Sequence, residues 1–98
     1  MKVLIIEDSQ DFAKPLKNFF SLDGHTHDHA CTLSEAREFI NVSHYDMILL
    51  DIMLPDGDGR RFLSEMRSRN DDSPVIVMTA RSEVTDRIDL LDIGADDY

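Results

Sequence analysis

The feature that most constrains the fold of this chain is a regular alternation of short apolar runs with longer amphipathic stretches. Residues 3–6, 47–50 and 75–78 form runs rich in branched apolar side chains and without a polar face. Such runs are typical of strands buried on both faces of a parallel sheet. The more polar segment 25–30 falls where a further strand is needed. The alternation therefore predicts four strands, with a fifth beginning at Asp96.

Amphipathic stretches separate the apolar runs. Their apolar residues recur at helical spacing: Phe12, Leu16, Phe19 and Phe20 in the first; Leu33, Ala36 and Ile40 in the second; Phe62, Leu63 and Met66 in the third; Val84, Ile88 and Leu91 in the fourth. We expect the phenylalanines of the first stretch to lie in the core. Strands that alternate with helices imply right-handed crossovers and an α/β fold with a doubly wound parallel sheet.

Two helix boundaries are also visible in the sequence. Thr32, followed by Glu35 three residues later, matches a capping box and predicts that Thr32 begins the second helix as its N-cap. Gly24 lies just after the first amphipathic stretch, where a helix end favours a residue with left-handed backbone. Both signals agree with the helices expected from periodicity.

Size and charge limit the classes of protein to which the chain can belong. Its 98 residues suit one domain, 1–98. Twenty acidic against ten basic side chains give a net charge of −10, which disfavours direct contact with nucleic acid or an anionic membrane. The single cysteine, Cys31, excludes an internal disulfide, and no apolar run has the length of a membrane span. We therefore expect a cytoplasmic globular protein.

Acidic and hydroxyl residues follow the predicted strands. Glu7 and Asp8 come directly after the first strand, Asp51 follows the third, and Thr79 follows the fourth. Reactive groups of an open parallel sheet gather beyond the carboxyl ends of its strands. If the first and third strands are neighbours, three carboxylates converge there, and a hard divalent cation such as Mg²⁺ is their natural counterion. The pattern indicates a phosphoryl-transfer centre with a carboxylate nucleophile.

A series of motifs follows the same strand ends in order. They are Glu7-Asp8, Asp51, Leu54-Pro55-Asp56-Gly57-Asp58-Gly59, Met78-Thr79-Ala80-Arg81 and Gly94-Ala95-Asp96-Asp97-Tyr98. Together these motifs resemble the CheY-like receiver domain of response regulators in two-component systems. The resemblance covers the whole chain, and it implies a flavodoxin-like (βα)5 fold.

The resemblance also implies a role for each acidic residue at the strand ends. Asp51 matches the aspartate that accepts a phosphoryl group from a sensor histidine kinase. Asp8, Asp51 and the backbone carbonyl of Met53 match direct ligands of Mg²⁺, and Glu7 matches a residue that contacts the ion mainly through water. The domain would then be a regulatory phosphoacceptor that assists its own phosphorylation and dephosphorylation, and not an enzyme.

Two further positions match the residues that transmit phosphorylation in this family. Thr79 matches the hydroxyl residue that turns toward the phosphoryl group, and Tyr98 matches the aromatic switch residue that follows it inward. The segment 80–98 is most similar to OmpR/PhoB-like regulators, whose separate output domain binds DNA. The parent protein would then be a transcription factor, and we expect this chain itself to contact no DNA.

The chain departs from the pattern of this family at its carboxyl end. The family's lysine, which pairs with the phosphoryl group, belongs a few residues after Tyr98. The chain therefore resembles a receiver without most of the fifth strand and without the fifth helix. For such a receiver we expect low stability as a monomer, or self-association that completes the sheet or forms a homodimer.

Two other functions remain open at this point. A phosphatase of the haloacid-dehalogenase kind also uses a strand-end aspartate, but it expects a second aspartate where this chain has Met53. A receiver-like interaction module that works without phosphorylation is the other alternative.

Two further motifs suggest metal sites and have simpler interpretations. Asp56-Gly57-Asp58-Gly59 resembles the start of a calcium loop, but Arg67 stands where the loop needs Glu, so we expect a tight turn. His25, His27 and His29 alternate, which on one strand would place them on one face as a zinc or nickel site. Partial exposure at a sheet edge is the simpler expectation for these histidines.

Overall fold

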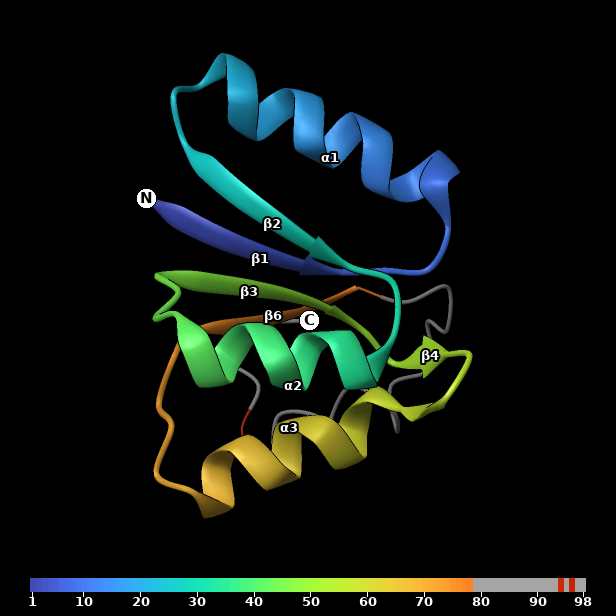
Figure 1. The fold of residues 1–98 in the computed structure, drawn as a ribbon, viewed down its shortest axis with the longest axis vertical. Helices are drawn as coiled ribbons and strands as arrows, with labels where there is room; N and C mark the ends of the chain where they lie inside the picture. The colour runs from blue at the N-terminus through green and yellow to red at the C-terminus, as the bar shows by residue number, and fades with distance from the viewer. Residues whose placement is uncertain (79–93, 95, 97–98) are drawn as a thin grey trace.

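The computed structural model describes residues 1–78, 94 and 96 of the chain (Figure 1). Its elements follow one another in the order β1 (Lys2–Ile6), α1 (Gln10–Leu22), β2 (Thr26–Ala30), α2 (Leu33–Val42), β3 (Met47–Asp51), β4 (Met53–Leu54), β5 (Gly57–Asp58), α3 (Gly59–Ser68) and β6 (Val75–Met78). The four strands predicted from the sequence are all present. The fourth amphipathic stretch lies outside the described residues.

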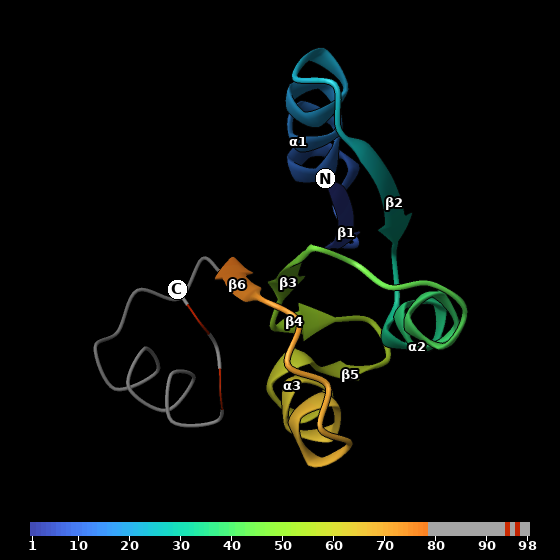
Figure 2. The same cartoon turned by 90° about the vertical axis from the view of Figure 1, so that its left-hand side faces the viewer.

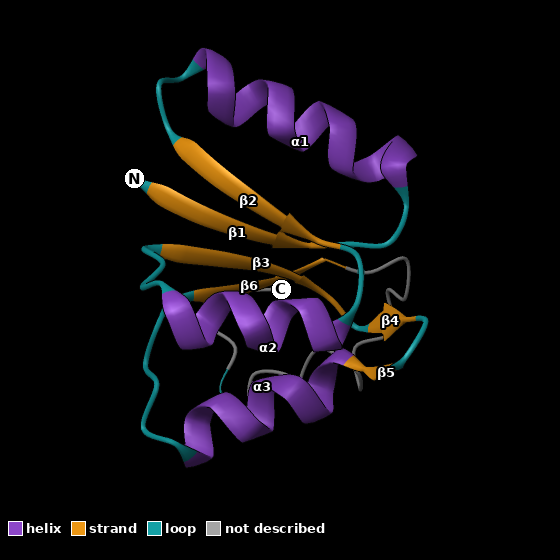
Figure 3. Ribbon diagram, viewed as in Figure 1, coloured by secondary structure: helices purple, strands orange, loops and turns teal. Residues whose placement is uncertain are grey.

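The strands β2, β1, β3 and β6 lie side by side in that order in one parallel sheet (Figure 3). The second strand is added on one side of β1 and the third on the other side, which is the order of a flavodoxin-like sheet. The predicted doubly wound architecture is therefore confirmed. The register pairs Ile6 with Leu50, so that β1 and β3 end next to each other.

Helices cover the two faces of the sheet (Figure 2). On one face, Phe20 of α1 packs against Val3 and Ile5 of β1. On the other face, α2 and α3 pack against a larger cluster that includes Leu4 and Ile6 of the same strand. Successive residues of β1 thus enter opposite cores, which explains why the strand has no polar face. Within the described part of the chain, no helix has the length and apolar character needed to span a bilayer.

The core prediction for the phenylalanines of α1 is right for one residue and wrong for two. Phe20 is 5% exposed, whereas Phe12 is 69% and Phe19 is 61% exposed. The face of α1 that contacts the sheet is centred on Ala13 and Phe20. Phe12 and Phe19 project roughly a quarter turn away from this face, since successive residues are about 100° apart around a helix.

The predicted helix boundaries are confirmed. Thr32 is the N-cap of α2, and its hydroxyl oxygen accepts a hydrogen bond from the Glu35 backbone N–H at 3.1 Å. Gly24 follows the last residue of α1 and its cap, with a φ of 78°. A residue with a side chain would be strained in this left-handed conformation, so glycine is suited to end the helix here.

The segment that follows β3, where we expect a tight turn, forms a short two-stranded hairpin around such a turn and not a calcium loop. β4 and β5 pair antiparallel, with Met53 opposite Asp58. Asp58 then caps α3, because its carboxylate accepts a hydrogen bond from the Arg60 backbone N–H at 2.8 Å. This carboxylate is therefore engaged in starting a helix.

The alternating histidines lie at the edge of the sheet, where partial exposure was expected. Each imidazole has a different partner: Nε2 of His25 lies 3.1 Å from Asp23, Nε2 of His27 lies 3.1 Å from the Ser21 hydroxyl, and Nε2 of His29 lies 2.6 Å from the Glu7 carbonyl. Among the described residues, the histidines form no group with metal-ligand spacing. The hypothesis of a zinc or nickel site receives no support.

Candidate functional site

Three carboxylates meet where β1 and β3 end side by side. Glu7 and Asp8 follow β1 directly, and Asp51 is the last residue of β3. One ligand oxygen from each side chain lies within 4.8 Å of the others. The convergence expected from the sequence is therefore confirmed, and its cause is the parallel pairing of the two strands.

Glu7 is the buried member of this acidic cluster, with 6% of its surface exposed. Its backbone N–H donates to the Ala30 carbonyl at 3.0 Å, which extends the pairing of β1 with β2 by one residue. Burial raises the pKa of the Glu7 carboxyl to about 7, and the negative charge of Asp51 acts in the same direction. A hydrogen bond from the Ser9 backbone N–H to Oε1 at 3.0 Å partly opposes this shift.

Asp8 and Asp51 are more accessible than Glu7. Asp8 is exposed and Asp51 is half-buried. Oδ1 of Asp51 accepts a hydrogen bond from the Met53 backbone N–H at 3.2 Å, which holds the first turn of the following loop against this carboxylate. Asp51 is thus accessible to a reactant, whereas Glu7 is buried.

The acidic cluster fits a divalent cation chemically. Like charges that are brought together and partly buried either take up protons or bind a cation. The ion pairs that the described residues form, of His25, Arg37, Arg60 and Arg67, are made with Asp23, Glu65, Asp58 and Asp96 and not with the acidic cluster. Carboxylate oxygens are the ligands that Mg²⁺ prefers, and the ion keeps several water molecules when one or two carboxylates bind it. Glu7, Asp8 and Asp51 therefore form a donor set suited to Mg²⁺.

Met53, Thr79 and Tyr98 are the other predicted site residues. The Met53 side chain is 63% exposed at the start of β4, directly beyond Asp51. The role of its backbone carbonyl stays a prediction. Thr79 and Tyr98, the predicted switch residues, lie outside the described residues.

Asp56 makes contacts with α2 that the sequence does not predict. The segment around Asp56 was expected to be only a tight turn, yet its carboxylate accepts hydrogen bonds from two backbone N–H groups of α2. The partners are 23 and 22 residues away in the sequence. Because the donors are backbone groups, their residue types carry no signal that would have revealed this contact.

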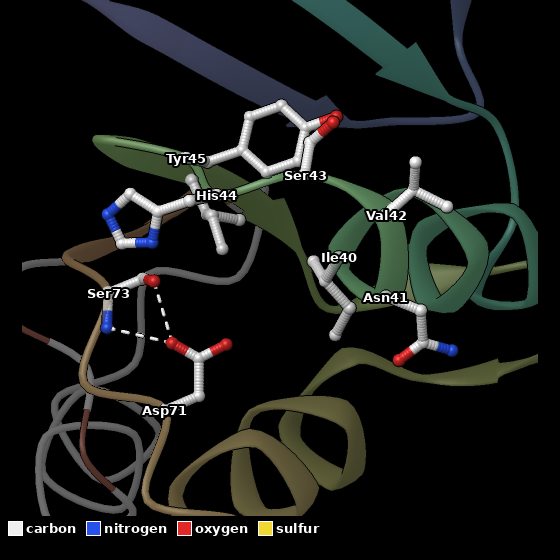
Figure 4. Close-up of a pocket in the computed structure, with 9 residues that line it drawn as sticks. Ile40, Asn41, Val42, Ser43, His44, Tyr45, Asp71 and Ser73 are labelled. Carbon is white, nitrogen blue, oxygen red and sulfur yellow. Dashed lines mark hydrogen bonds between the residues drawn. The ribbon is translucent and has the colours of Figure 1, made fainter.

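A hollow of about 280 Å³ lies at the other end of the sheet (Figure 4). It is lined by Ile40, Asn41, Val42, Ser43, His44, Tyr45, Ile48, Asp71 and Ser73. The carboxylate of Asp71 in its wall is engaged, because it accepts hydrogen bonds from the Ser73 backbone N–H and hydroxyl (Figure 4). The acidic cluster, and not this hollow, is therefore the candidate functional site.

Curated relatives resemble the chain along its full length. It is 44% identical over 98 residues to the transcriptional regulatory protein PmrA of Pectobacterium parmentieri and 39% identical over 98 residues to the transcriptional regulatory protein BasR of Escherichia coli strain K12. The matches cover all of this chain and 44% of each relative. The chain thus spans less than half the length of these relatives.

Solved structures show the same fold. The receiver domain of the Francisella response regulator 1452 has a TM-score of 0.94 and 35% identity, with 99% of this chain and 80% of that chain covered. A two-component response regulator from Clostridium difficile has a TM-score of 0.95 and 35% identity, with 100% and 80% covered. The family model of the response regulator receiver domain matches residues 3–98. The chain therefore belongs to the response regulator receiver family.

Proposed function

We propose that this receiver domain is a phosphoacceptor switch in which Asp51 receives a phosphoryl group from a sensor histidine kinase with the help of Mg²⁺. The observation that carries the proposal is the convergence of Glu7, Asp8 and Asp51 at the ends of two neighbouring strands. Membership of the receiver family supports the same assignment. The domain acts as a regulatory substrate of the kinase, in the cytoplasm.

In the proposed transfer, one carboxylate oxygen of Asp51 attacks the phosphorus atom. The bond between phosphorus and the histidine nitrogen of the kinase breaks, and the imidazole leaves with the bonding electrons. The product is an acyl phosphate on Asp51. Asp51 suits this role because it is half-buried and reachable, and because the Met53 N–H fixes one of its oxygens.

The remaining acidic residues hold the metal in this proposal. Asp8, Asp51 and the Met53 carbonyl would hold the ion directly, and Glu7 would contact it through water. When bound, Mg²⁺ supplies positive charge that neutralises the phosphoryl oxygens during transfer. Glu7 would act on the bound ion through water in its ionised form, so metal binding would favour release of the proton that burial retains on this carboxyl.

The switch is proposed to act through Thr79 and Tyr98. Formation of the acyl phosphate draws the Thr79 hydroxyl inward and allows Tyr98 to reorient, which changes the surface offered to partners. The output is proposed to be DNA binding by another domain of an OmpR/PhoB-like parent protein. The names of the two curated relatives, both transcriptional regulatory proteins of more than twice this length, support this output.

Incubation with acetyl phosphate and Mg²⁺, followed by intact-mass measurement, tests the proposal. We expect the chain to gain one phosphoryl group, and Asp51→Asn to gain none. Asp46→Asn is the matched control, because Asp46 precedes the same strand at its opposite end. Asp46→Asn should be phosphorylated like the wild type. No gain in the wild type with any phosphodonor would favour an interaction module that works without phosphorylation, and equal gain in Asp51→Asn would exclude Asp51 as the acceptor.

A further inference from the structure

Asp56 connects the loop beyond Asp51 to the start of α2. It lies in the turn between β4 and β5. Its Oδ1 accepts a hydrogen bond from the Leu33 backbone N–H at 2.8 Å, and its Oδ2 accepts one from the Ser34 backbone N–H at 3.0 Å. Both oxygens of one carboxylate are thus used by the first two residues of a helix.

The first turn of α2 is completed by this contact. The Glu35 and Ala36 backbone N–H groups donate to the hydroxyl and carbonyl oxygens of Thr32. The bond from Ala36 is the first regular bond of the helix, and the Thr32 hydroxyl caps Glu35, so the N–H groups of Leu33 and Ser34 depend on Asp56. Four N–H groups at a helix start lack a partner within the helix, and a negative charge there is favourable because of the helix dipole. In agreement, the hydrogen bond from Leu33 is the largest cause that lowers the pKa of Asp56.

A packing contact joins the same turn to the same helix. A Cβ atom added at Gly57 would lie 3.1 Å from Cδ1 of Leu33, which is buried in the core. Gly57 also has a φ of 157°, where a side chain is strained. The turn therefore contacts α2 in two ways: its backbone at Gly57 packs against Leu33, and the Asp56 carboxylate binds the N–H groups of the first helical turn.

The other end of this segment is bound to Asp51, whose Oδ1 accepts a hydrogen bond from the Met53 backbone N–H at 3.2 Å. The Gly59 backbone N–H donates to the Ile52 carbonyl at 2.8 Å, and Met53 pairs with Asp58 across the hairpin. A Cβ atom on Gly59 would collide with the carbonyl oxygen of Asp51. The backbone of Met53 thus lies between two anchors, one at Asp51 and one at Asp56.

We propose that Asp56 is a positioning residue for the metal site. By binding the N-terminus of α2, it would hold the segment 52–58 in the conformation in which the Met53 carbonyl would serve, together with Asp51, as a ligand of Mg²⁺. This role rests on the proposed function, because it requires the acidic cluster to bind Mg²⁺. It differs from helix capping alone, which would stabilise α2 without affecting the affinity for the metal.

Mg²⁺ titrations of the full chain, followed by the backbone amide signals of Asp51 and Met53 in NMR spectra, test this role. The variants are Asp56→Ala, which loses both acceptors, and Asp56→Asn, which retains one acceptor oxygen. Thr32→Ala is the matched control, because it removes a capping acceptor from the same helix but leaves the hairpin untouched. Thermal unfolding of each variant measures the capping contribution separately.

We expect Asp56→Ala to weaken Mg²⁺ binding by on the order of tenfold, as is usual for residues that orient metal ligands. Asp56→Asn should recover part of this loss, and Thr32→Ala should bind Mg²⁺ like the wild type although its melting temperature falls. Equal Mg²⁺ affinity in Asp56→Ala and Thr32→Ala would overturn the role, and so would a wild type that binds no Mg²⁺. A wild type that binds Mg²⁺ but accepts no phosphoryl group would contradict only the proposed function, since the titration involves no transfer.

Discussion

The two ends of the same sheet differ in whether their charged side chains have partners. At the carboxyl ends of β1 and β3, the carboxylates of Glu7, Asp8 and Asp51 converge, and burial raises the pKa of Glu7 to about 7. At the amino end of β6, one cation is surrounded by acceptors. Arg67 donates from Nε and both terminal nitrogens, and its acceptors are the carbonyls of Asp71, Ser73 and Gly94 and the carboxylate of Asp96.

The difference between the two ends follows from what each group can bind. The guanidinium of Arg67 has five N–H donors, and five hydrogen bonds are formed. At this end, every N–H donor of Arg67 therefore has a partner, and these hydrogen bonds stabilise the fold. The carboxylates of the acidic cluster repel one another, and binding of a proton or a cation relieves this repulsion. Among the residues that the structure describes, this uncompensated charge marks the end of the sheet suited to bind a ligand.

Removal of the guanidinium is expected to have the largest effect on stability. Arg67→Ala leaves three backbone carbonyls without their donor and separates Asp96 from its cation, and we expect a loss of about 2–4 kcal/mol in the free energy of unfolding. Urea denaturation of the variant measures this loss. Arg61→Ala, at an exposed position of the same helix, is the control and should change stability by less than about 0.5 kcal/mol. Equal losses in the two variants would show that the amino end is not held by Arg67.

Neutralisation at the opposite end is expected to stabilise the protein. The pKa of Glu7 is about 7 in the folded chain and 4.5 ordinarily, so the folded state binds this proton more tightly than the unfolded state. The resulting stability is fully present below pH 4.5 and is lost as the pH rises through about 7. At pH 8 without Mg²⁺, Glu7→Gln should therefore be more stable than the wild type by roughly 1–3 kcal/mol.

Chemical denaturation at pH 5 and pH 8 measures this effect of Glu7. The advantage of Glu7→Gln should shrink at pH 5, where the wild-type carboxyl is protonated. It should also shrink at pH 8 when Mg²⁺ is added, since the cation then compensates the ionised cluster. A wild type that is more stable than Glu7→Gln at pH 8 without Mg²⁺ would mean that the acidic cluster is not repulsive, and the contrast between the two ends would fail.

The strands and the acidic cluster could be predicted from the sequence because their signals are local. A strand buried on both faces requires a continuous apolar run, and Glu7 and Asp51 come directly after such runs. Parallel pairing then brings the strand ends together. Phe12 and Phe19 were assigned wrongly to the core, because helical periodicity shows that a helix has an apolar face but does not fix which part of that face contacts the sheet.

The contacts of Asp56 and Arg67 could not be predicted for a different reason. Asp56 binds backbone N–H groups of α2, and Arg67 binds mainly backbone carbonyls. Every residue except proline has both groups, so the sequence does not show which of them will be partners. Long-range contacts between a side chain and the backbone become visible only when the fold places the two segments together.

The smallest effect is expected at Asp46, a carboxylate at the amino end of the sheet. Its Oδ2 accepts a hydrogen bond from the Lys2 backbone N–H at 2.8 Å at an exposed position. Asp46→Asn retains an acceptor oxygen, so we expect a change of less than about 0.5 kcal/mol in the free energy of unfolding, with or without Mg²⁺. Denaturation in both conditions measures this change. A Mg²⁺-dependent difference for Asp46→Asn would show that the cation also binds at the amino end, whereas its absence, together with a Mg²⁺-dependent difference for Glu7→Gln, would confine cation binding to the end where β1 and β3 terminate.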